Sequence, residues 1–157
     1  TCSYTPTDAL MDGSHTIRCD ASDYDGNAAS QVSTTFKIDT TPPALSITSP
    51  ADGYVTNKNT ITVSGVTNDI TSSPVTVTIN GEVVTVASDG KFSKDVALKI
   101  VGNNSITIIA KDNAGQTTTI TRIVRYDPNP PKITGAEATP NPVDTGKTYV
   151  LSVTVTD

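Results

Sequence analysis

Few side chains in this sequence are of the types that carry covalent or metal chemistry. His15 is the single histidine among 157 residues, and Cys2 and Cys19 are the two cysteines. A catalytic triad needs a base beside a nucleophile, and neither a serine nor a cysteine stands in a recognisable setting with His15. The cysteines lie 17 positions apart, which fits neither a zinc cluster nor a redox C-x-x-C pair. The sequence therefore predicts a protein that is not an enzyme, with His15 as a solvated residue at the start of a strand.

Oxygen-bearing side chains offer a second kind of chemistry, because calcium prefers hard oxygen ligands. Three aspartates and an asparagine, Asp20, Asp23, Asp25 and Asn27, fall close together and could bind this ion. They lack the residue order of an EF-hand loop and its distant glutamate. The alternative is that one aspartate caps the backbone amides of a turn while the others face solvent. Only Asp23 has an aspartate, Asp112, at the equivalent place in the repeat described below, which favours the turn.

The elements that must position these residues are β-strands. Thr, Val and Ile contribute 28, 16 and 13 residues against 4 Leu, which is typical of strands. The 10 Pro and 10 Gly punctuate the chain and disfavour a helical bundle or a βαβ scaffold. No apolar run approaches the roughly 20 residues of a membrane span, so none is expected in this segment. The net charge of −5 disfavours nucleic acid as a partner.

An internal repeat of about 88 residues organises the chain. The segment HTIRCDASDYDGN at 15–27 aligns with NSITIIAKDNAGQ at 104–116, at an offset of 89. Farther along, FKIDTTPPAL at 36–45 aligns with VRYDPNPPKI at 124–133, at an offset of 88. The sequence thus contains one complete copy of a unit, flanked by two partial copies.

Double prolines mark the seams between the copies. A proline cannot donate to a β-ladder and restricts the residue before it to extended geometry, so each pair is interpreted as a short stiff linker. The module linkers are Pro42 with Pro43, and Pro130 with Pro131. The predicted organisation is the C-terminal part of one module, a complete module and the N-terminal part of a further module, at residues 1–41, 42–129 and 130–157.

An aspartate precedes each pair of prolines. Asp39 and Asp127 could join calcium sites between modules, and calcium is the one cofactor that the sequence suggests. The same position is explained equally well by formation of the turn before a proline. The sequence is therefore compatible with both roles.

The complete unit has the pattern of a β-sandwich. Alternating apolar residues and turn signals predict seven or eight short strands. Asn80 and Gly81 join strands at 75–79 and 82–86, because both positions of this hairpin turn must accept positive φ. A turn is expected at Gly102 to Asn104, and a final strand is expected at Thr117 to Tyr126.

Several motifs resemble those of bacterial immunoglobulin-like (Ig-like) modules. The first copy resembles the closing strands of bacterial Ig-like tandem repeats, in L-x-D-G-x-H-T-I (10–17), D-x-x-G-N (23–27) and F-x-I-D-T-T-P-P (36–43). The middle unit is similar to the Ig-like accessory domain of glucodextranase, in I-T-S-P-x-D-G (47–53), V-x-I-N-G-E (77–82) and I-x-A-x-D-N-A-G (108–115). The resemblance implies an all-β fold of tandem Ig-like β-sandwich modules. It carries over no catalytic residue.

The Ig-like resemblance also bears on the two cysteines. Cys19 occupies the place of Ile108, which is expected to face the core, and Cys2 lies in the preceding strand segment. In an Ig-like sandwich that segment would run in the opposite sheet, which implies a cross-sheet disulfide and an oxidising compartment. Two buried free thiols are the alternative.

These features predict a mechanical function. We expect an extracellular or cell-surface structural or spacer module of a surface protein or filament, with neighbouring Ig-like modules or other copies of itself as partners. The partial copies would supply three strands in residues 1–40 and two strands in residues 132–157, so strand complementation could join chains head to tail. The alternative is a piece of a longer array. The competing functions are an accessory module of a secreted carbohydrate-active enzyme and an adhesin stalk.

Overall fold

The computed structural model describes residues 5–139, 141–142 and 145–157, and its regular elements are all β-strands. The strands are β1 (Gly13–Cys19), β2 (Val32–Ile38), β3 (Ala44–Ser49), β4 (Tyr54–Thr56), β5 (Thr60–Asn68), β6 (Thr76–Ile79), β7 (Glu82–Val84), β8 (Lys91–Ala97), β9 (Gly102–Lys111), β10 (Thr117–Tyr126), β11 (Lys132–Thr139) and β12 (Val150–Thr156). No helix in these ranges is long and apolar enough to cross a membrane.

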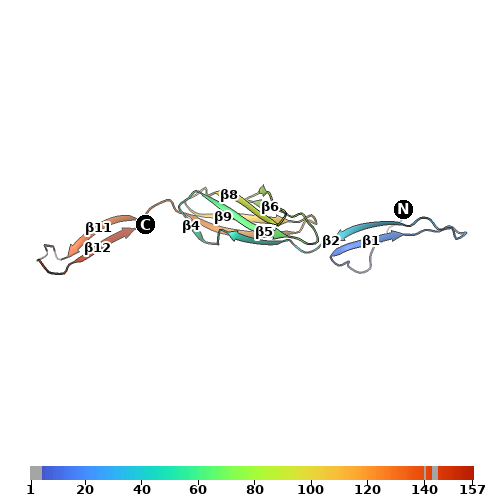
Figure 1. Ribbon diagram of the computed structural model, residues 1–157, viewed down its shortest axis with the longest axis horizontal. Helices are drawn as coiled ribbons and strands as arrows, with labels where there is room; N and C mark the ends of the chain where they lie inside the picture. The colour runs from blue at the N-terminus through green and yellow to red at the C-terminus, as the bar shows by residue number, and fades with distance from the viewer. Residues whose placement is uncertain (1–4, 140, 143–144) are drawn as a thin grey trace.

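The strands form three groups that follow one another along the long axis of the molecule (Figure 1). β1 and β2 pair as an antiparallel hairpin, β3 to β10 form the middle unit, and β11 and β12 pair as a second hairpin. Strand pairing stops at residues 39–43, the first seam, and again at residues 127–131, the second seam. Both seams contain a double proline, which cannot take part in a ladder.

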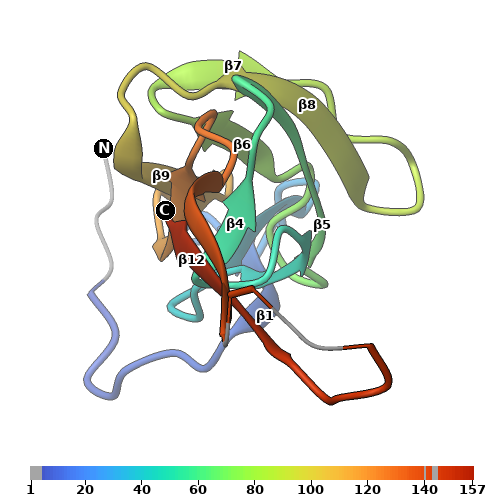
Figure 2. The ribbon, with the colours of Figure 1, turned by 90° about the vertical axis from the view of Figure 1, so that its left-hand side faces the viewer.

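Two sheets form the middle unit, and Figure 2 gives the view along its axis. One sheet has the strand order β3-β5-β8, and the other has the order β4-β10-β9-β6-β7. β3 and β4 follow each other in the chain but lie in different sheets, and β4 pairs in parallel with β10. Asp52 anchors the turn between them, because its Oδ1 accepts the amide of Ile123 in β10 at 2.8 Å. This is an Ig-like β-sandwich.

The core lies between these two sheets and follows the two-residue period of a strand. In β9 the side chains of Ile106, Ile108 and Ala110 are buried, whereas the residues between them are partly exposed. Val63 and Phe92 of the opposite sheet belong to the same hydrophobic cluster. Full burial of side chains of this size contributes about 1.5–3 kcal/mol each. The middle unit therefore has the complete core that a stable module requires.

Local sequence signals predicted parts of this unit well. Asn80 and Gly81 have φ of 50° and 84°, which confirms the predicted hairpin between β6 and β7. β10 spans the predicted Thr117–Tyr126. The turn expected at Gly102 to Asn104 was wrong, because these residues pair with the end of β10 and begin β9. β4 was missed, because three residues show too little alternation to predict a strand.

No second sheet covers either hairpin among the described residues. Ile17 in β1 is 40% exposed, whereas its repeat equivalent Ile106 is 1% exposed. Cys19 is exposed, so the expectation that it points between two sheets was wrong: in the part of the chain that the structure describes, the sheet that covers Ile108 has no counterpart over β1. Cys2 and most of the strand expected around it lie outside the described residues, so the disulfide stays a prediction.

We expect Ile106→Ala to lower the free energy of unfolding by about 2–5 kcal/mol, because it leaves a cavity between the sheets. Ile17→Ala, at the equivalent place of the repeat, should cost less than about 1 kcal/mol, because this side chain is already partly solvated. Urea denaturation followed by circular dichroism measures both. Equal losses for the two variants would contradict the assignment of the core to the middle unit.

Candidate functional site

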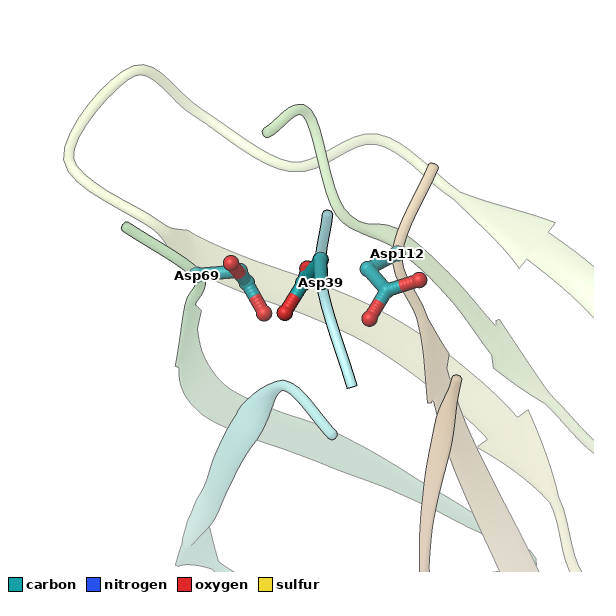
Figure 3. Close-up of side chains that lie close together, drawn as sticks. All are labelled: Asp39, Asp69 and Asp112. Carbon is teal, nitrogen blue, oxygen red and sulfur yellow. The ribbon is translucent and has the colours of Figure 1, made fainter. Parts of the chain in front are cut away.

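Three aspartates from separate segments meet at the first seam (Figure 3). Asp39 directly follows β2, Asp69 directly follows β5 and Asp112 directly follows β9. One carboxylate oxygen of each residue lies within 4.8 Å of the others. We call these three residues the seam cluster. Its members come from the end of the first hairpin and from both sheets of the middle unit.

Asp112 begins the turn between β9 and β10. Its Oδ1 accepts the backbone amides of Gly115 at 2.7 Å and Gln116 at 2.9 Å. Gly115 has a φ of 97°, a conformation that glycine adopts at little cost. The turn-capping role that the repeat suggested for an aspartate at this position is therefore present, and it occupies only one of the two carboxylate oxygens.

Asp69 and Asp39 follow the same pattern. Asp69 Oδ1 accepts the amides of Thr71 at 2.8 Å and Ser72 at 2.7 Å. Asp39 Oδ1 accepts the amide of Thr41 at 3.2 Å, in the turn that leads to the first double proline. Each aspartate thus uses Oδ1 to fix the backbone that follows it, which sets the direction of the second oxygen.

Hydrogen bonds also hold the loops of the cluster to one another. Asn113 donates from its backbone amide to the carbonyl of Ser72 at 3.2 Å, and from Nδ2 to the carbonyl of Ser73 at 2.9 Å. Across the seam, Lys37 Nζ of β2 donates to the carbonyl of Thr71 at 3.3 Å. The loop after β5 is therefore bonded both to the turn after β9 and to the hairpin.

Two of the second oxygens in the seam cluster lack such partners among the described residues. Oδ2 of Asp39 and Oδ2 of Asp112 are buried and have no hydrogen-bond partner among the described residues. Asp112 is 5% exposed and Asp69 is 8% exposed. Within the described ranges, no lysine, arginine or histidine nitrogen lies within 4.0 Å of any of the three carboxylates. Like charges at this separation and burial repel one another, and an unpaired buried charge is costly.

The seam linker itself is held from the side of the middle unit. Thr118 Oγ1 donates to the carbonyl of Pro43 at 2.6 Å, and Thr67 Oγ1 donates to the carbonyl of Ala44 at 2.8 Å. The side chain of Pro43 is fully buried, whereas Pro42 is exposed. The linker is therefore packed onto the middle unit and has little freedom to rotate.

Asp12 holds the linker from the side of the hairpin. Its Oδ1 accepts the amide and the hydroxyl of Thr40, each at 2.9 Å, and its Oδ2 accepts the hydroxyl of Thr41 at 2.7 Å. The Thr41 hydroxyl, followed by that of Thr40, lowers the pKa of Asp12 below its ordinary value of 3.8. The sequence had placed Asp12 in a motif but gave it no role, because its partners Thr40 and Thr41 lie in the linker, beyond the other strand of the hairpin.

The acidic group predicted from sequence does not form a comparable cluster. Asp23 Oδ1 accepts the amides of Asp25 at 3.0 Å and Asn27 at 2.8 Å, and its Oδ2 accepts Nδ2 of Asn27 at 2.7 Å. The side-chain amide of Asn27 is the main cause that lowers the pKa of Asp23. Asp20 Oδ1 accepts Nε2 of Gln31 at 2.7 Å instead. Both oxygens of Asp23 are thus used within its own turn.

The second seam differs from the first. Asp127 Oδ1 accepts the amide of Asn129 at 3.2 Å, as Asp39 does with Thr41, but its Oδ2 is paired with Arg125 at 3.1 Å. The prolines of this linker, Pro130 and Pro131, are exposed. Among the described residues, Asp127 belongs to no group of three metal-ligating side chains like the seam cluster.

His15 is less solvated than predicted. Its ring stacks on Phe36 with ring centroids 5.7 Å apart, and its Nε2 lies 2.7 Å from the carbonyl oxygen of Met11. The side chain is partly buried for this reason. It stands across the β1–β2 ladder from Phe36, a packing position that its polar type did not suggest.

The fold and strand order define the middle unit as an Ig-like module of the β-sandwich class. Residues 43–127 match the family described as glucodextranase, domain B, and the chain belongs to this family. The matched range begins and ends at the two seams. This confirms the Ig-like fold and the similarity to the glucodextranase accessory domain that the motifs suggested.

The chain is also similar to individual proteins. It is 35% identical over 126 residues to Bacillopeptidase F of Bacillus subtilis (strain 168). The aligned segment covers 80% of this chain and 8% of that relative. Fibronectin(III)-like modules of Clostridium thermocellum CbhA match with a TM-score of 0.42 and 19% identity, over 75% of this chain and 64% of theirs. A tetra-tandem repeat from the extending region of a large adhesion protein matches with a TM-score of 0.42 and 20% identity, over 92% of this chain and 46% of its own.

The lowered pKa of Asp12 predicts how the end of the hairpin responds to acid. A lowered folded pKa means that the contribution of this carboxylate is complete above its ordinary value of 3.8 and is lost as the pH falls through the lower folded value. We expect the Asp12 carboxyl carbon, followed by NMR, to titrate below 3.8, and the amide of Thr40 to lose protection from exchange in the same range. Thr40→Ala combined with Thr41→Val should bring the titration back toward the ordinary value, and an unchanged titration would show that these bonds are not formed.

Proposed function

We propose that this chain is a non-enzymatic spacer segment of an extracellular or cell-surface array of Ig-like modules. The observation that carries the proposal is the first seam, where hydrogen bonds fix the linker to the hairpin before it and to the middle unit after it. A spacer must keep successive modules in line, so its seams need contacts that limit rotation. Ig-like modules and glucodextranase domains are typical of extracellular proteins.

The contacts of the first seam suit this role. The linker is only five residues long, at 39–43, and it contains two prolines with restricted φ. Lys37 bonds directly from the hairpin to Thr71 of the middle unit at 3.3 Å. A single hydrogen bond contributes only about 1 kcal/mol, so alignment depends on several such bonds acting together with the stiff linker.

The surface composition also supports spacing over recognition. The chain has no Trp and 5 Tyr, whereas sugar-binding faces usually stack such rings on their ligand. Its 28 Thr supply polar side chains for exposed strand positions, which keep sheet surfaces hydrated.

A second candidate function is that of an accessory module in a secreted enzyme. The family is described as a domain of glucodextranase, and the relative from Bacillus subtilis is a bacillopeptidase by name. This chain spans 8% of that relative, so the name of the whole relative does not describe this segment. A catalytic domain elsewhere in the full-length protein would favour this function over that of a surface array or an adhesin stalk.

A further part of the proposal concerns other copies of the chain as partners. In the repeat, β1 and β2 correspond to β9 and β10, while β11 and β12 correspond to β3 and β5. These pairs of strands face each other in the middle unit, where they belong to opposite sheets. The terminal hairpins expose apolar side chains at the equivalent places, including Val32, Leu151 and Val153. The second hairpin of one chain could therefore cover the first hairpin of the next.

The spacer proposal predicts that the first hairpin and the middle unit tumble together. In backbone ¹⁵N relaxation, we compare the ratio of transverse to longitudinal relaxation rates in β1–β2 with the ratio in β3–β10. A single elongated diffusion tensor should fit both groups of residues. Insertion of a flexible Gly-Ser segment between Thr41 and Pro42 should release the hairpin, which would then tumble faster than the middle unit. Independent tumbling before the insertion, both with and without calcium, would overturn the proposal.

Head-to-tail complementation predicts self-association that depends on the hairpin faces. Sedimentation velocity should show species larger than the monomer as the concentration rises, and Leu151→Lys should abolish them by placing a charge on the exposed apolar face of β12. Val83→Lys, at an exposed position of β7 in the middle unit, is the matched control and should leave association unchanged. A monomer at all concentrations would rule out complementation by the isolated chain.

A further inference from the structure

We propose that the seam cluster, Asp39, Asp69 and Asp112, binds a hard divalent cation of the calcium class. The ion would lie between the first hairpin, which supplies Asp39, and the middle unit, which supplies the other two ligands. A single ion would then join two successive modules directly. This inference goes beyond the spacer function, because the site exists or fails independently of what the array does.

The distances within the cluster fit one shared ion. Calcium takes oxygen ligands at about 2.3–2.6 Å, so two oxygens on opposite sides of the ion lie up to about 5 Å apart. In the seam cluster, one oxygen of each aspartate lies within 4.8 Å of the others. Figure 3 shows Asp39 between Asp69 and Asp112, with the three carboxyl groups close together. All three can therefore reach one ion without a large movement of the backbone.

An unpartnered buried oxygen points independently to a ligand. Asp112 is 5% exposed, and its Oδ2 has no hydrogen-bond partner among the described residues, although its Oδ1 has two. Oδ2 of Asp39 is also buried without a partner. A buried carboxylate oxygen normally has a donor or a metal ion, because an unpaired buried charge is costly. A cation between the aspartates would satisfy these oxygens and remove the repulsion among the three charges.

The basic residue that precedes Asp39 in the hairpin does not pair with its carboxylate. Lys37 precedes Asp39 by two residues, as Arg125 precedes Asp127. At the second seam the arginine pairs with Oδ2 of the aspartate at 3.1 Å. At the first seam the lysine instead donates to the carbonyl of Thr71, and among the described residues Oδ2 of Asp39 is left without a hydrogen-bond partner. The two seams thus place the same type of aspartate in two electrostatic settings.

The donor set favours calcium over magnesium. Calcium accepts six to eight oxygens in irregular geometry, whereas magnesium requires a near-ideal octahedron at shorter distances. The three aspartates come from separate loops on two sides of a seam, which favours the more tolerant ion. One pocket is lined by Asp39 and Lys37 and another by Asp69 and Pro42, so there is open space beside two of the ligands for waters that would complete the coordination.

All three positions recur as aspartates in the repeat. Asp39 corresponds to Asp127 and Asp112 corresponds to Asp23. Asp69 corresponds to Asp157. The strand pair Ala44↔Asn68 becomes the strand pair Lys132↔Thr156 when 88 is added to both residue numbers, and Asp69 and Asp157 are the next residues along. In this chain these counterparts stand apart: Asp127 is paired with Arg125, and Asp23 bonds to Asn27. Asp127 and Asp23 are therefore matched controls for the ligands.

Calcium binding tests the site directly. The 157-residue chain, stripped with a chelator, should bind one Ca²⁺ by isothermal titration calorimetry, in the range of about 10⁻⁴–10⁻³ M or tighter that extracellular modules show. Amide shifts in ¹H–¹⁵N spectra should centre on residues 39–41, 69–73 and 112–116. Magnesium at the same concentration should bind at least about tenfold more weakly. Equal binding of magnesium would overturn the assignment to calcium.

Variants locate the ion. Asp112→Asn and Asp39→Asn should each weaken calcium binding at least about tenfold, while the amide oxygen can still cap the turn and preserve the fold. Asp23→Asn and Asp127→Asn should leave binding unchanged. Asp39→Asn lies outside the middle unit, so it tests the site even if Asp112→Asn unfolds. Absence of binding at about 10 mM Ca²⁺, or equal losses in the control variants, would overturn the proposal.

The same samples separate this inference from the spacer function. If the hairpin and the middle unit tumble together in chelator and no calcium binds, the cation site is wrong and the spacer function stands. If calcium binds at the seam cluster but the two parts still tumble independently, the site stands and the spacer function fails. A change from independent to common tumbling on addition of calcium would support both.

Discussion

Mutual coverage of two apolar sheet faces is the constraint on which the rest of this structure depends. In the middle unit, β5 and β8 cover β9 and β10, so Ile106 and Ile108 are almost completely removed from water. In the terminal hairpins the same repeat positions are exposed, because the described residues hold no second sheet over them. A pair of strands gains little stability by itself, so the covering sheet decides which copy of the repeat has a core.

The packed sheets also fix the geometry of the first seam. Asp69 follows β5 of one sheet and Asp112 follows β9 of the other, so the distance between their loops is set by the packing of the core. The linker then brings Asp39 to these loops, because Thr118 holds the carbonyl of Pro43 and Asp12 holds Thr40. Three charges are thus held together by a fold whose stability comes from apolar contacts elsewhere. Repulsion within the cluster is a local cost that the core can tolerate.

Sequence reasoning predicted what local chemistry determines. The turn at Asn80 and Gly81 requires positive φ at both residues, and β10 follows a turn signal and is rich in Thr, Ile and Val, so both were identified correctly. Cys19 was misplaced because the repeat specifies which face of a strand a residue occupies, whereas burial depends on whether another sheet lies over that face. The seam cluster was only partly anticipated, through Asp39, because Asp69 and Asp112 meet it through tertiary packing. The recurrence of all three positions as aspartates in the repeat was the available signal, and the recurrence of Asp69 as Asp157 was the part that went unused.

An aspartate that begins a turn can also serve a second purpose, and this explains why such sites are difficult to detect from sequence. The turn uses one oxygen to accept backbone amides, and the other oxygen is left to the surroundings. The second oxygen of Asp23 accepts a hydrogen bond from Asn27, and that of Asp127 pairs with Arg125, so both have a partner nearby in the chain. The second oxygens of Asp112 and Asp39 have no such partner among the described residues, and the neighbouring groups across the seam are carboxylates. The residue type and the turn are the same in each case, and only the position of the neighbouring module distinguishes a simple cap from a ligand.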